Sequence, residues 1–270
     1  MGLRSTRAVV SRTMRMSNSS KLVSLITEHY GLVKVIGKGA RRPRSVFGAA
    51  LEPITLIECI YYHHDIRDIQ TLSSAETIKP YMALKEDLTL LAVASCIVEI
   101  AQMHTAEEDV SAGTFGLVVE TLDSLESSGR KGADKHLWRY VLRLLGAVGY
   151  KPTLDSCVKC GKKPKGTSVF FSYGDGGVLC SCTEPGERYG FRVSAGSLMV
   201  MNNLLEASDP ELPRLVIGKS QRAEVEKTLL NFLAYHSGSS KTPKSLAFLR
   251  RIEREKIKNS HEGAKARRNT

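Results

Sequence analysis

The hydrophobic period changes near Lys79 and Pro80, and this change restricts the possible folds more than any other feature of the sequence. Before it, roughly from residue 7 to residue 76, apolar and polar residues alternate in short runs, which is typical of half-buried β-strands. After it, apolar residues recur at spacings of three and four, which is the period of an amphipathic helix. The sequence therefore predicts an α+β protein with an N-terminal β-region and a helical remainder.

The N-terminal region contains enough short strands for a small barrel. We expect strands to begin at Ala8 and to cover residues 22–26, 32–38, 46–51, 54–62 and 66–72. Several short strands with turn signals between them are typical of such barrels. We predict that residues 1–80 form a five-stranded oligonucleotide-binding (OB-fold) barrel, whose third strand belongs to an open binding face.

A basic ribbon follows the third predicted strand and the turn after it. Between residues 34 and 44 the chain has five cations and no acid. Cations held on a strand and its turn can follow a phosphate backbone. A solvated basic loop without a ligand is the alternative interpretation. The candidate DNA-binding residues are Lys34, Lys38, Arg41, Arg42 and Arg44.

The formal net charge of +11 is concentrated at the two ends of the chain. Residues 1–51 carry ten Lys and Arg against one acid, and residues 244–270 carry nine against three. Residues 52–243 carry twenty against twenty-four and are slightly acidic. Two basic ends on a near-neutral body predict two anion-facing regions, with nucleic-acid affinity that falls steeply with salt.

No apolar run of the sequence reaches the roughly 18–20 residues that span a bilayer. The N-terminus also lacks the apolar core of a secretory signal peptide. We therefore expect a cytoplasmic protein with no membrane partner.

Helical spacing predicts three helices before the cysteine cluster and three after it, at residues 84–103, 112–125, 135–148, 197–205, 221–235 and 246–257. We expect a helical domain in two parts, residues 81–152 and 194–258. Residues 153–193 break the helical pattern and form an inserted module. Residues 259–270 are polar and basic, which predicts a disordered tail.

Four of the six cysteines cluster within this inserted module. Cys157 and Cys160 form a Cys-x-x-Cys pair followed by glycine, and Cys180 and Cys182 follow twenty residues later. Four thiolates at this separation suit a structural, tetrahedral Zn²⁺ site with no open position for a catalytic water. The other two cysteines, at positions 59 and 96, lie in apolar runs and are expected to be buried core thiols.

The single-residue gap of the second pair is an obstacle to this zinc site. On a regular strand Cys180 and Cys182 would share one face about 7 Å apart, which is too far unless the chain bends. The glycines at 176 and 177 favour such a bend. Reduced cysteines without metal, or a mixed site that uses one member of the second pair, remain alternatives.

His63, His64 and Asp65 suggest a metal-dependent hydrolase as a third class of function. Adjacent side chains on a strand point to opposite faces, which argues against joint ligation by the two histidines. A surface turn explains the three residues more simply. No nucleophile signature, phosphate-binding loop or zincin helix is present in the sequence, so we expect no enzyme activity.

Several stretches of the chain resemble the RecO family of bacterial DNA-repair recombination mediators. The basic turn 38–42 followed by Ser45 is the most specific of them. The others are residues 8–10, 25–31, 50–53, 142–152 leading to the first cysteine pair, and the Gly-Gly-x-x-Cys run at 176–180. The resemblance covers about residues 7–250.

The resemblance implies a non-enzymatic protein that binds single- and double-stranded DNA and anneals complementary strands. It implies RecR and single-stranded-DNA-binding protein as partners, with RecF and RecA involved indirectly, and a location at the bacterial nucleoid. One departure concerns the metal, because zinc-binding members usually carry a second Cys-x-x-Cys where this chain has Cys-x-Cys. An RNA- or ribosome-associated zinc/OB-fold protein is the alternative function.

Overall fold

The computed structural model of this protein describes residues 2–105, 113–181, 189–237, 242–252 and 254–255. Its strands are β1 (Gly2–Arg15), β2 (Lys21–Thr27), β3 (Leu32–Gly37), β4 (Leu56–His63), β5 (Ile69–Lys79), β6 (Ser168–Ser172), β7 (Gly177–Leu179) and β8 (Gly190–Ser194). Its helices are α1 (Met82–Glu86), α2 (Leu88–His104), α3 (Gly113–Ser128), α4 (Ala133–Ala147), α5 (Ala195–Glu206), the short 3₁₀ helix η1 (Leu212–Arg214) and α6 (Lys219–Ser237). The predicted change from strands to helices near residue 80 is confirmed.

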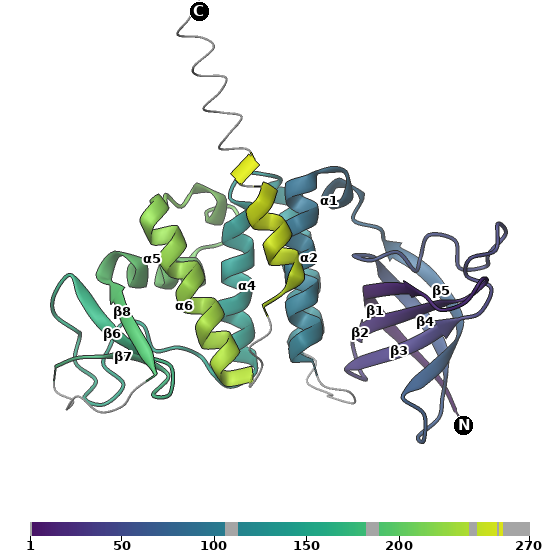
Figure 1. Ribbon diagram of the computed structural model, residues 1–270, viewed down its shortest axis with the longest axis horizontal. Coiled ribbons are helices and arrows are strands. Elements are labelled where there is room, and N and C mark those ends of the chain that lie inside the picture. Colours follow the sequence, from purple (N-terminus) through teal and green to yellow (C-terminus); the bar gives the residue numbers. More distant parts are fainter. Residues whose placement is uncertain (1, 106–112, 182–188, 238–241, 253, 256–270) are drawn as a thin grey trace, which may run out of the picture. The chain divides into compact units, whose positions relative to one another are not determined.

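The first five strands close into a barrel with the order β1-β2-β3-β5-β4 (Figure 1). The barrel closes because β1 pairs antiparallel with both β2 and β4. The β3–β5 pair is parallel, and the other pairs are antiparallel. This five-stranded barrel is consistent with the predicted OB-fold.

Alternation along the strands directs every second side chain into the barrel core. On β4, Ile57, Cys59 and Tyr61 point inward and are at most 1% exposed. A register shift between Val10 and Arg12 marks a bulge in β1, so the residues that point inward change from even to odd numbers there. The core is therefore formed by residues from all five strands.

The strand predicted at residues 46–51 is wrong. This segment forms consecutive turns, with backbone hydrogen bonds from Gly48 N to Ser45 O and from Ala50 N to Phe47 O. Phe47, Ala50 and Leu51 are buried in the barrel core. Their apolar character reflects this burial and not strand pairing.

The helix α2 is apolar around most of its circumference, as its sequence predicts, and nine of its residues are buried. Asp87 caps its N-terminus, because the carboxylate accepts hydrogen bonds from the backbone of Thr89 and Leu90. The Glu99 carboxylate of α2 accepts backbone hydrogen bonds from Lys244 and Ser245, both at 2.9 Å. These two residues begin the predicted basic helix, which the structure confirms from residue 244 to residue 252.

A second small sheet contacts the helices α5 and α6 through its strand β8. The helix α4 packs against α5 and α6, and the strands β7-β6-β8 form an antiparallel three-stranded sheet (Figure 1). The strand predicted at Ser168–Ser172 and the predicted helices at 135–148, 197–205 and 221–235 are confirmed to within a few residues.

The chain divides into two compact units. One contains residues 1–126 and 243–270, and the other contains residues 127–242. The predicted boundaries after residues 80, 152, 193 and 258 remain predictions, and the predicted disordered tail lies outside the described residues. Among the described helices, none is both long and apolar enough to cross a membrane.

Candidate nucleic-acid interface and cysteine cluster

The outer face of β1, β2 and β3 carries two neighbouring rows of side chains. Arg12, Ser24 and Lys34 lie opposite one another in register and form a polar row. The next row consists of Met14, Leu22 and Ile36. Met14 is exposed, whereas Leu22 and Ile36 are half-buried. Cations beside partly exposed apolar side chains suit a nucleic acid, which offers phosphates and flat base surfaces together.

The basic turn after β3 extends this face. Lys38, Arg41, Arg42 and Arg44 are all exposed. Arg42 N donates to the carbonyl oxygen of Gly39, which has a φ of 75° in the left-handed region that glycine favours. The structure thus places four of the five predicted DNA-binding residues in one exposed turn, with Lys34 on the adjoining strand.

Arg41 differs from the other cations of the turn because it also fixes the position of the turn. Its Nη1 donates to the carbonyl oxygens of Ser17 and Asn18 at 2.8 and 3.1 Å, and its backbone N donates to Ser19 O at 3.0 Å. These bonds attach the basic turn to the β1–β2 turn. Arg41 therefore has a structural role that the sequence did not reveal.

The sequence prediction missed two further cations beside this face. Arg12 lies in the same cross-strand row as Lys34, with Ser24 between them. The Arg15 guanidinium donates a hydrogen bond to the Asn18 side chain at 2.7 Å. Alternation did not reveal Arg12, because continuing the pattern of Ala8 and Val10 would place it inside the barrel. The bulge after Val10 changes the side of the strand on which Arg12 lies.

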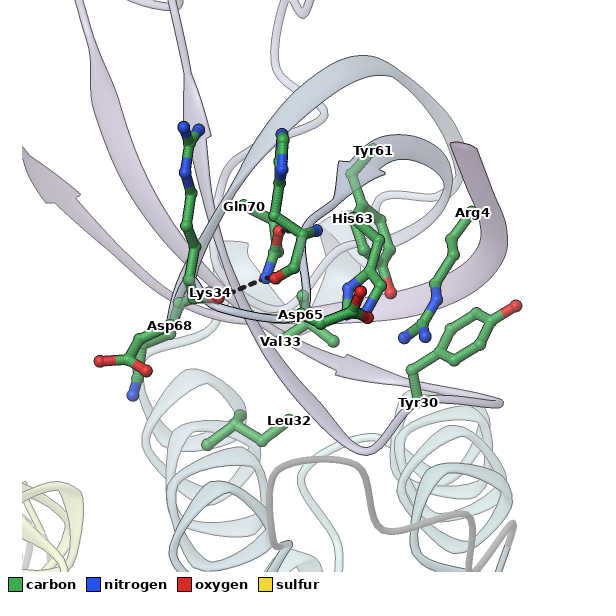
Figure 2. Close-up of a pocket in the computed structure, with 12 residues that line it drawn as sticks. Arg4, Tyr30, Leu32, Val33, Lys34, Tyr61, His63, Asp65, Asp68 and Gln70 are labelled. Carbon is green, nitrogen blue, oxygen red and sulfur yellow. Dashed lines mark hydrogen bonds and ion pairs between the residues drawn. The ribbon is translucent and has the colours of Figure 1, made fainter. Parts of the chain in front are cut away.

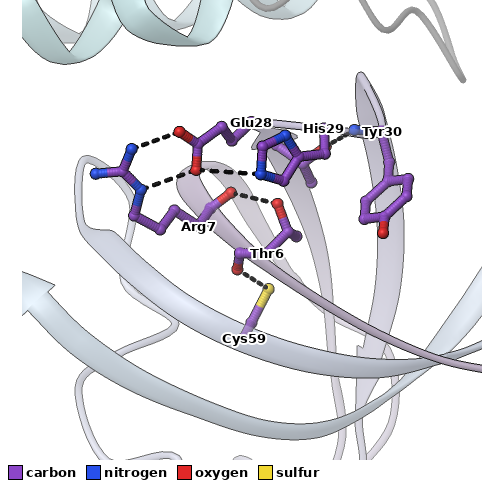
Figure 3. Close-up of polar contacts among 7 residues, drawn as sticks. Thr6, Arg7, Glu28, His29, Tyr30 and Cys59 are labelled. Atoms are coloured by element: carbon purple, nitrogen blue, oxygen red, sulfur yellow. Dashed lines mark hydrogen bonds and ion pairs between the residues drawn. The ribbon is translucent and has the colours of Figure 1, made fainter.

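Acids pair with two further cations of the N-terminal region, Arg7 and Lys21, and Lys21 lies opposite Gly37 at the start of the basic turn. The Glu28 carboxylate accepts two hydrogen bonds from the Arg7 guanidinium, one of them from Nε at 2.8 Å (Figure 3). These bonds lower the pKa of Glu28 and raise the pKa of Arg7. Lys21 contacts Glu52 at 2.7 Å. Both pairs are partly exposed, so each adds little stability and reduces the local positive charge.

Tyr61 and Tyr62 occupy opposite faces of β4, as predicted. Tyr61 is fully buried in the core, whereas Tyr62 is half-buried on the outer side. Core packing therefore accounts for the first ring, and the second is available to a ligand at the barrel surface.

Three of the four predicted metal ligands come together in the second unit. The Sγ atoms of Cys157, Cys160 and Cys180 all lie within 4.8 Å of one another, and those of Cys160 and Cys180 are 3.5 Å apart. Thiolates that share a tetrahedral Zn²⁺ stand about 3.8 Å apart, given Zn–S bonds of about 2.3 Å. The three cysteines are therefore suitable ligands for a metal ion, and Cys182 lies outside the described residues.

The backbone around Cys157 favours the thiolate that a metal requires. Burial raises the pKa of this thiol, but hydrogen bonds from the backbone amides of Cys180, Cys160 and Lys159 outweigh burial and lower the pKa to about 6. Gly161 donates from its N to Cys157 O at 2.8 Å and has a φ of 71°. The glycine thus closes the tight turn that directs these amides toward the sulfur.

The structure describes one member of the second cysteine pair, Cys180. The strand β7 ends at Leu179, so Cys180 already lies beyond it, and Ser181 is in a turn. Gly176 has a φ of 81°, which allows the sharp approach to this strand. Cys180 therefore does not lie on a regular strand, and the bend expected between Cys180 and Cys182 remains a prediction.

The proposed hydrolase residues do not form a metal site. His63 Nε2 lies 3.0 Å from Asp65 Oδ1, but the backbone of His64 is held by Gln70 in a loop, with its N donating to Gln70 Oε1 at 2.8 Å. In the part of the chain that the structure describes, the group of metal-ligating side chains that meet around one point is the cysteine cluster. The turn interpretation of these residues is therefore favoured.

Comparison with known proteins gives the family. The family model for the N-terminal part of recombination protein O matches residues 1–81, and the model for its C-terminal part matches residues 85–247. The DNA repair protein RecO of Salinibacter ruber is 31% identical over 249 residues, which are 92% of this chain and 94% of that protein. The DNA repair protein RecO of an Anaeromyxobacter species is 30% identical over 85% of this chain and 90% of that protein. The chain therefore belongs to the RecO family of DNA repair proteins.

Proposed function

We propose that this protein is a DNA-binding recombination mediator that binds single- and double-stranded DNA and anneals complementary strands. The observation that carries the proposal is the exposed basic turn 38–44 beside the polar and apolar rows on the outer face of the barrel. Membership in a family of DNA repair proteins makes DNA the expected polyanion. The barrel is, on this proposal, an OB-fold that uses this face for binding.

The physical basis of annealing is charge neutralisation. Two complementary strands repel one another through their phosphates, and a surface that carries several cations lowers this barrier by holding both strands. Phosphate contacts carry no information about base identity, so annealing should tolerate any sequence. The mechanism requires no bond making or breaking, and we therefore propose a function without enzymatic turnover.

The proposed partners follow from the family. The protein would act at the cytoplasmic nucleoid on DNA coated by single-stranded-DNA-binding protein. It would help load RecA together with RecR, and with RecF where the pathway uses it. The helices outside the barrel would offer surfaces for these proteins, because the outer face of the barrel is assigned to DNA.

We further propose that the cysteine cluster holds a structural Zn²⁺, with Cys182 as the fourth ligand. The spacing of the three described sulfurs and the lowered pKa of Cys157 support this proposal. The ion would fix the loop of the first cysteine pair to the end of β7. Four protein ligands leave no position for substrate, so the metal has a structural role.

Strand annealing is the experiment that tests the function. Complementary oligonucleotides coated with single-stranded-DNA-binding protein are mixed with this protein across a salt series, without nucleotide or added metal. We expect accelerated annealing that weakens as salt rises. Tight binding of single strands without acceleration would contradict the mediator function, and a clear preference for matched RNA strands would favour the RNA-binding alternative.

A further inference from the structure

A pocket of about 240 Å³ lies at one end of the barrel, beside the loop between β4 and β5. Its lining includes Arg4, Tyr30, Lys34, Tyr61, His63 and Gln70 (Figure 2). Arg4 lies opposite Tyr61 in the β1–β4 register, and Tyr61 belongs to the core. Arg4 therefore shares the inner face of the barrel and places a cation at its end.

The Arg4 guanidinium has an aromatic neighbour but no acid to balance its charge. It stands 4.6 Å from the centroid of the Tyr30 ring, in a cation–π contact. In the described ranges of the chain, Arg4 makes no ion pair with an aspartate or glutamate. A partly buried cation without a carboxylate partner is a favourable position for an external anion.

The second unmatched group in the pocket is the Tyr61 hydroxyl. Tyr61 is 0% exposed, and its hydroxyl donates no hydrogen bond to a described residue, while the nearby Arg4 guanidinium acts on it as a donor. Buried hydroxyls are nearly always hydrogen-bonded, so this group lacks an acceptor. Figure 2 shows the Tyr61 and Arg4 side chains on the same side of the pocket, beside Tyr30 and His63. Because Arg4 and Tyr61 lie opposite one another in register, an anion bound to the guanidinium would offer an acceptor to the hydroxyl.

The wall of the pocket is held in place by hydrogen bonds. Gln70 is 6% exposed, and its side chain bonds to the backbone of His64 and Arg67. Asp65 and Asp68 also line the pocket, but both are exposed on the rim, and Asp65 contacts His63. The acids therefore face solvent, while the donors Arg4 and Tyr61 lie deeper.

We propose that this pocket binds the phosphomonoester at the end of a nucleic-acid strand. Such a group carries about −1.5 to −2 charges at neutral pH and three acceptor oxygens, which matches a guanidinium beside a hydroxyl that lacks an acceptor. The volume admits one phosphate and part of a sugar, whereas an internal phosphate is flanked by sugars on both sides and fits poorly. The inference rests on the proposed function, because it assumes that the barrel binds nucleic acid.

A phosphate at the 5′ end, a phosphate at the 3′ end and a free phosphate share this chemistry, and the test separates them. One short DNA strand is prepared without terminal phosphate, with a 5′ phosphate and with a 3′ phosphate, and affinity is measured at one salt concentration. Inorganic phosphate is then added as a competitor. We expect one phosphorylated form to bind about tenfold more tightly than the unmodified strand, as charge-assisted hydrogen bonds predict.

Two variants test the assigned donors. Arg4→Gln and Tyr61→Phe should each remove most of the preference for the phosphorylated strand. Arg214→Gln, which removes an exposed arginine of the other unit, should keep the preference. Because Tyr61→Phe preserves the packed ring, it remains informative if Arg4→Gln does not fold.

The result that overturns the pocket assignment is equal affinity of the native protein for all three strands. DNA binding would then stand without a terminal-phosphate site. Absence of binding to every strand would overturn the proposed function instead. In that case the His63 ring resonances are followed by NMR during titration with inorganic phosphate. A saturable shift that Arg4→Gln abolishes would support the anion site, and no shift would overturn it.

Discussion

The basic face of the barrel and the cysteine cluster are built from the sequence in different ways. Most cations of the basic face come from one short stretch, residues 34–44, whose charged groups lie in an exposed turn and on the adjoining strand, and Arg12 of β1 joins them. The cluster joins Cys157 and Cys160 to a residue twenty positions later, and Cys157 is buried. Exposed charges act through a long-range field to which each adds a similar share, whereas ligands of one ion act together. Loss of one group should therefore weaken the face slightly and disable the cluster completely.

The largest effect is expected from the cluster. We predict that the double variant Cys157→Ser/Cys160→Ser loses its bound metal and lowers the free energy of unfolding of residues 127–242 by several kcal/mol, because a structural zinc contributes its binding energy to folding. Elemental analysis and urea unfolding measure the two quantities. Cys59→Ala, which changes a buried thiol in the barrel core, should keep the metal. Unchanged metal content in the double variant would contradict the assignment of the metal to this cluster.

The second effect concerns the basic face. We predict that Lys38→Glu/Arg41→Glu/Arg42→Glu weakens DNA binding about a thousandfold at low salt and lowers the slope of log affinity against log salt by about three, one for each phosphate contact. Fluorescence anisotropy across a salt series measures both. The matched control reverses Lys131, Arg214 and Lys219, three exposed cations of the other unit. An equal loss in the control would show that net charge alone, and not this face, governs binding.

The third prediction tests whether water is excluded from the core of the second unit, where His136 is buried. Burial, with a smaller contribution from Arg139, lowers the pKa of the fully buried His136 from about 6.5 to about 4. Between pH 6.5 and about pH 4, His136 is therefore protonated in the unfolded chain but neutral in the folded chain.

Stability should then be complete above pH 6.5 and should fall by about 3 kcal/mol as the pH drops toward 4. Urea unfolding at a series of pH values measures this slope. His136→Asn, which cannot take up a proton, should flatten it. A slope of the same size in His136→Asn would assign the acid sensitivity to other groups.

The smallest effect is expected from the Arg7–Glu28 pair. The hydrogen bonds from Arg7 lower the pKa of Glu28. The pair therefore stabilises the fold at pH values above the ordinary glutamate pKa, and this contribution is lost as the pH falls through the lowered pKa. Because both side chains are partly exposed, Glu28→Gln should reduce the free energy of unfolding by less than about 1 kcal/mol. The same variant should raise DNA affinity slightly, since it removes an acid from the basic end. A decrease in affinity would contradict the additive account of the face.

Local pattern was sufficient for most of the barrel but not for the turn at 46–51. Phe47, Ala50 and Leu51 are apolar because the segment covers the barrel core, and their separations of three and one do not match the alternation of a strand. Burial alone selects apolar residues, so a short apolar run does not by itself identify a paired strand. Hydrogen bonds between neighbouring residues define this segment as a turn, and composition does not reveal them.

Pairings between distant strands were the other feature that the sequence did not contain. Arg4 and Tyr61 meet only because β1 pairs with β4, and the parallel contact of β3 with β5 brings Lys34 opposite Ile69. The candidate cations could be recognised from the sequence because they are neighbours in it. The pocket at the barrel end could not be recognised from the sequence, because its residues come from four separate segments. The position of Cys180 beyond the strand depends likewise on where β7 ends, which no spacing rule fixed.

The contact of Glu99 with Lys244 and Ser245 has a consequence for synthesis of the chain. It joins two parts of one unit across about 145 positions, with the whole of the other unit encoded between them. A ribosome that adds roughly 5–20 residues per second needs on the order of ten seconds to bridge this interval. During that time α2 lacks its last partner, and an apolar helix surface is accessible to chaperones. Completion of the first unit is therefore late in the order of synthesis, because it follows the emergence of residue 245 from the exit tunnel.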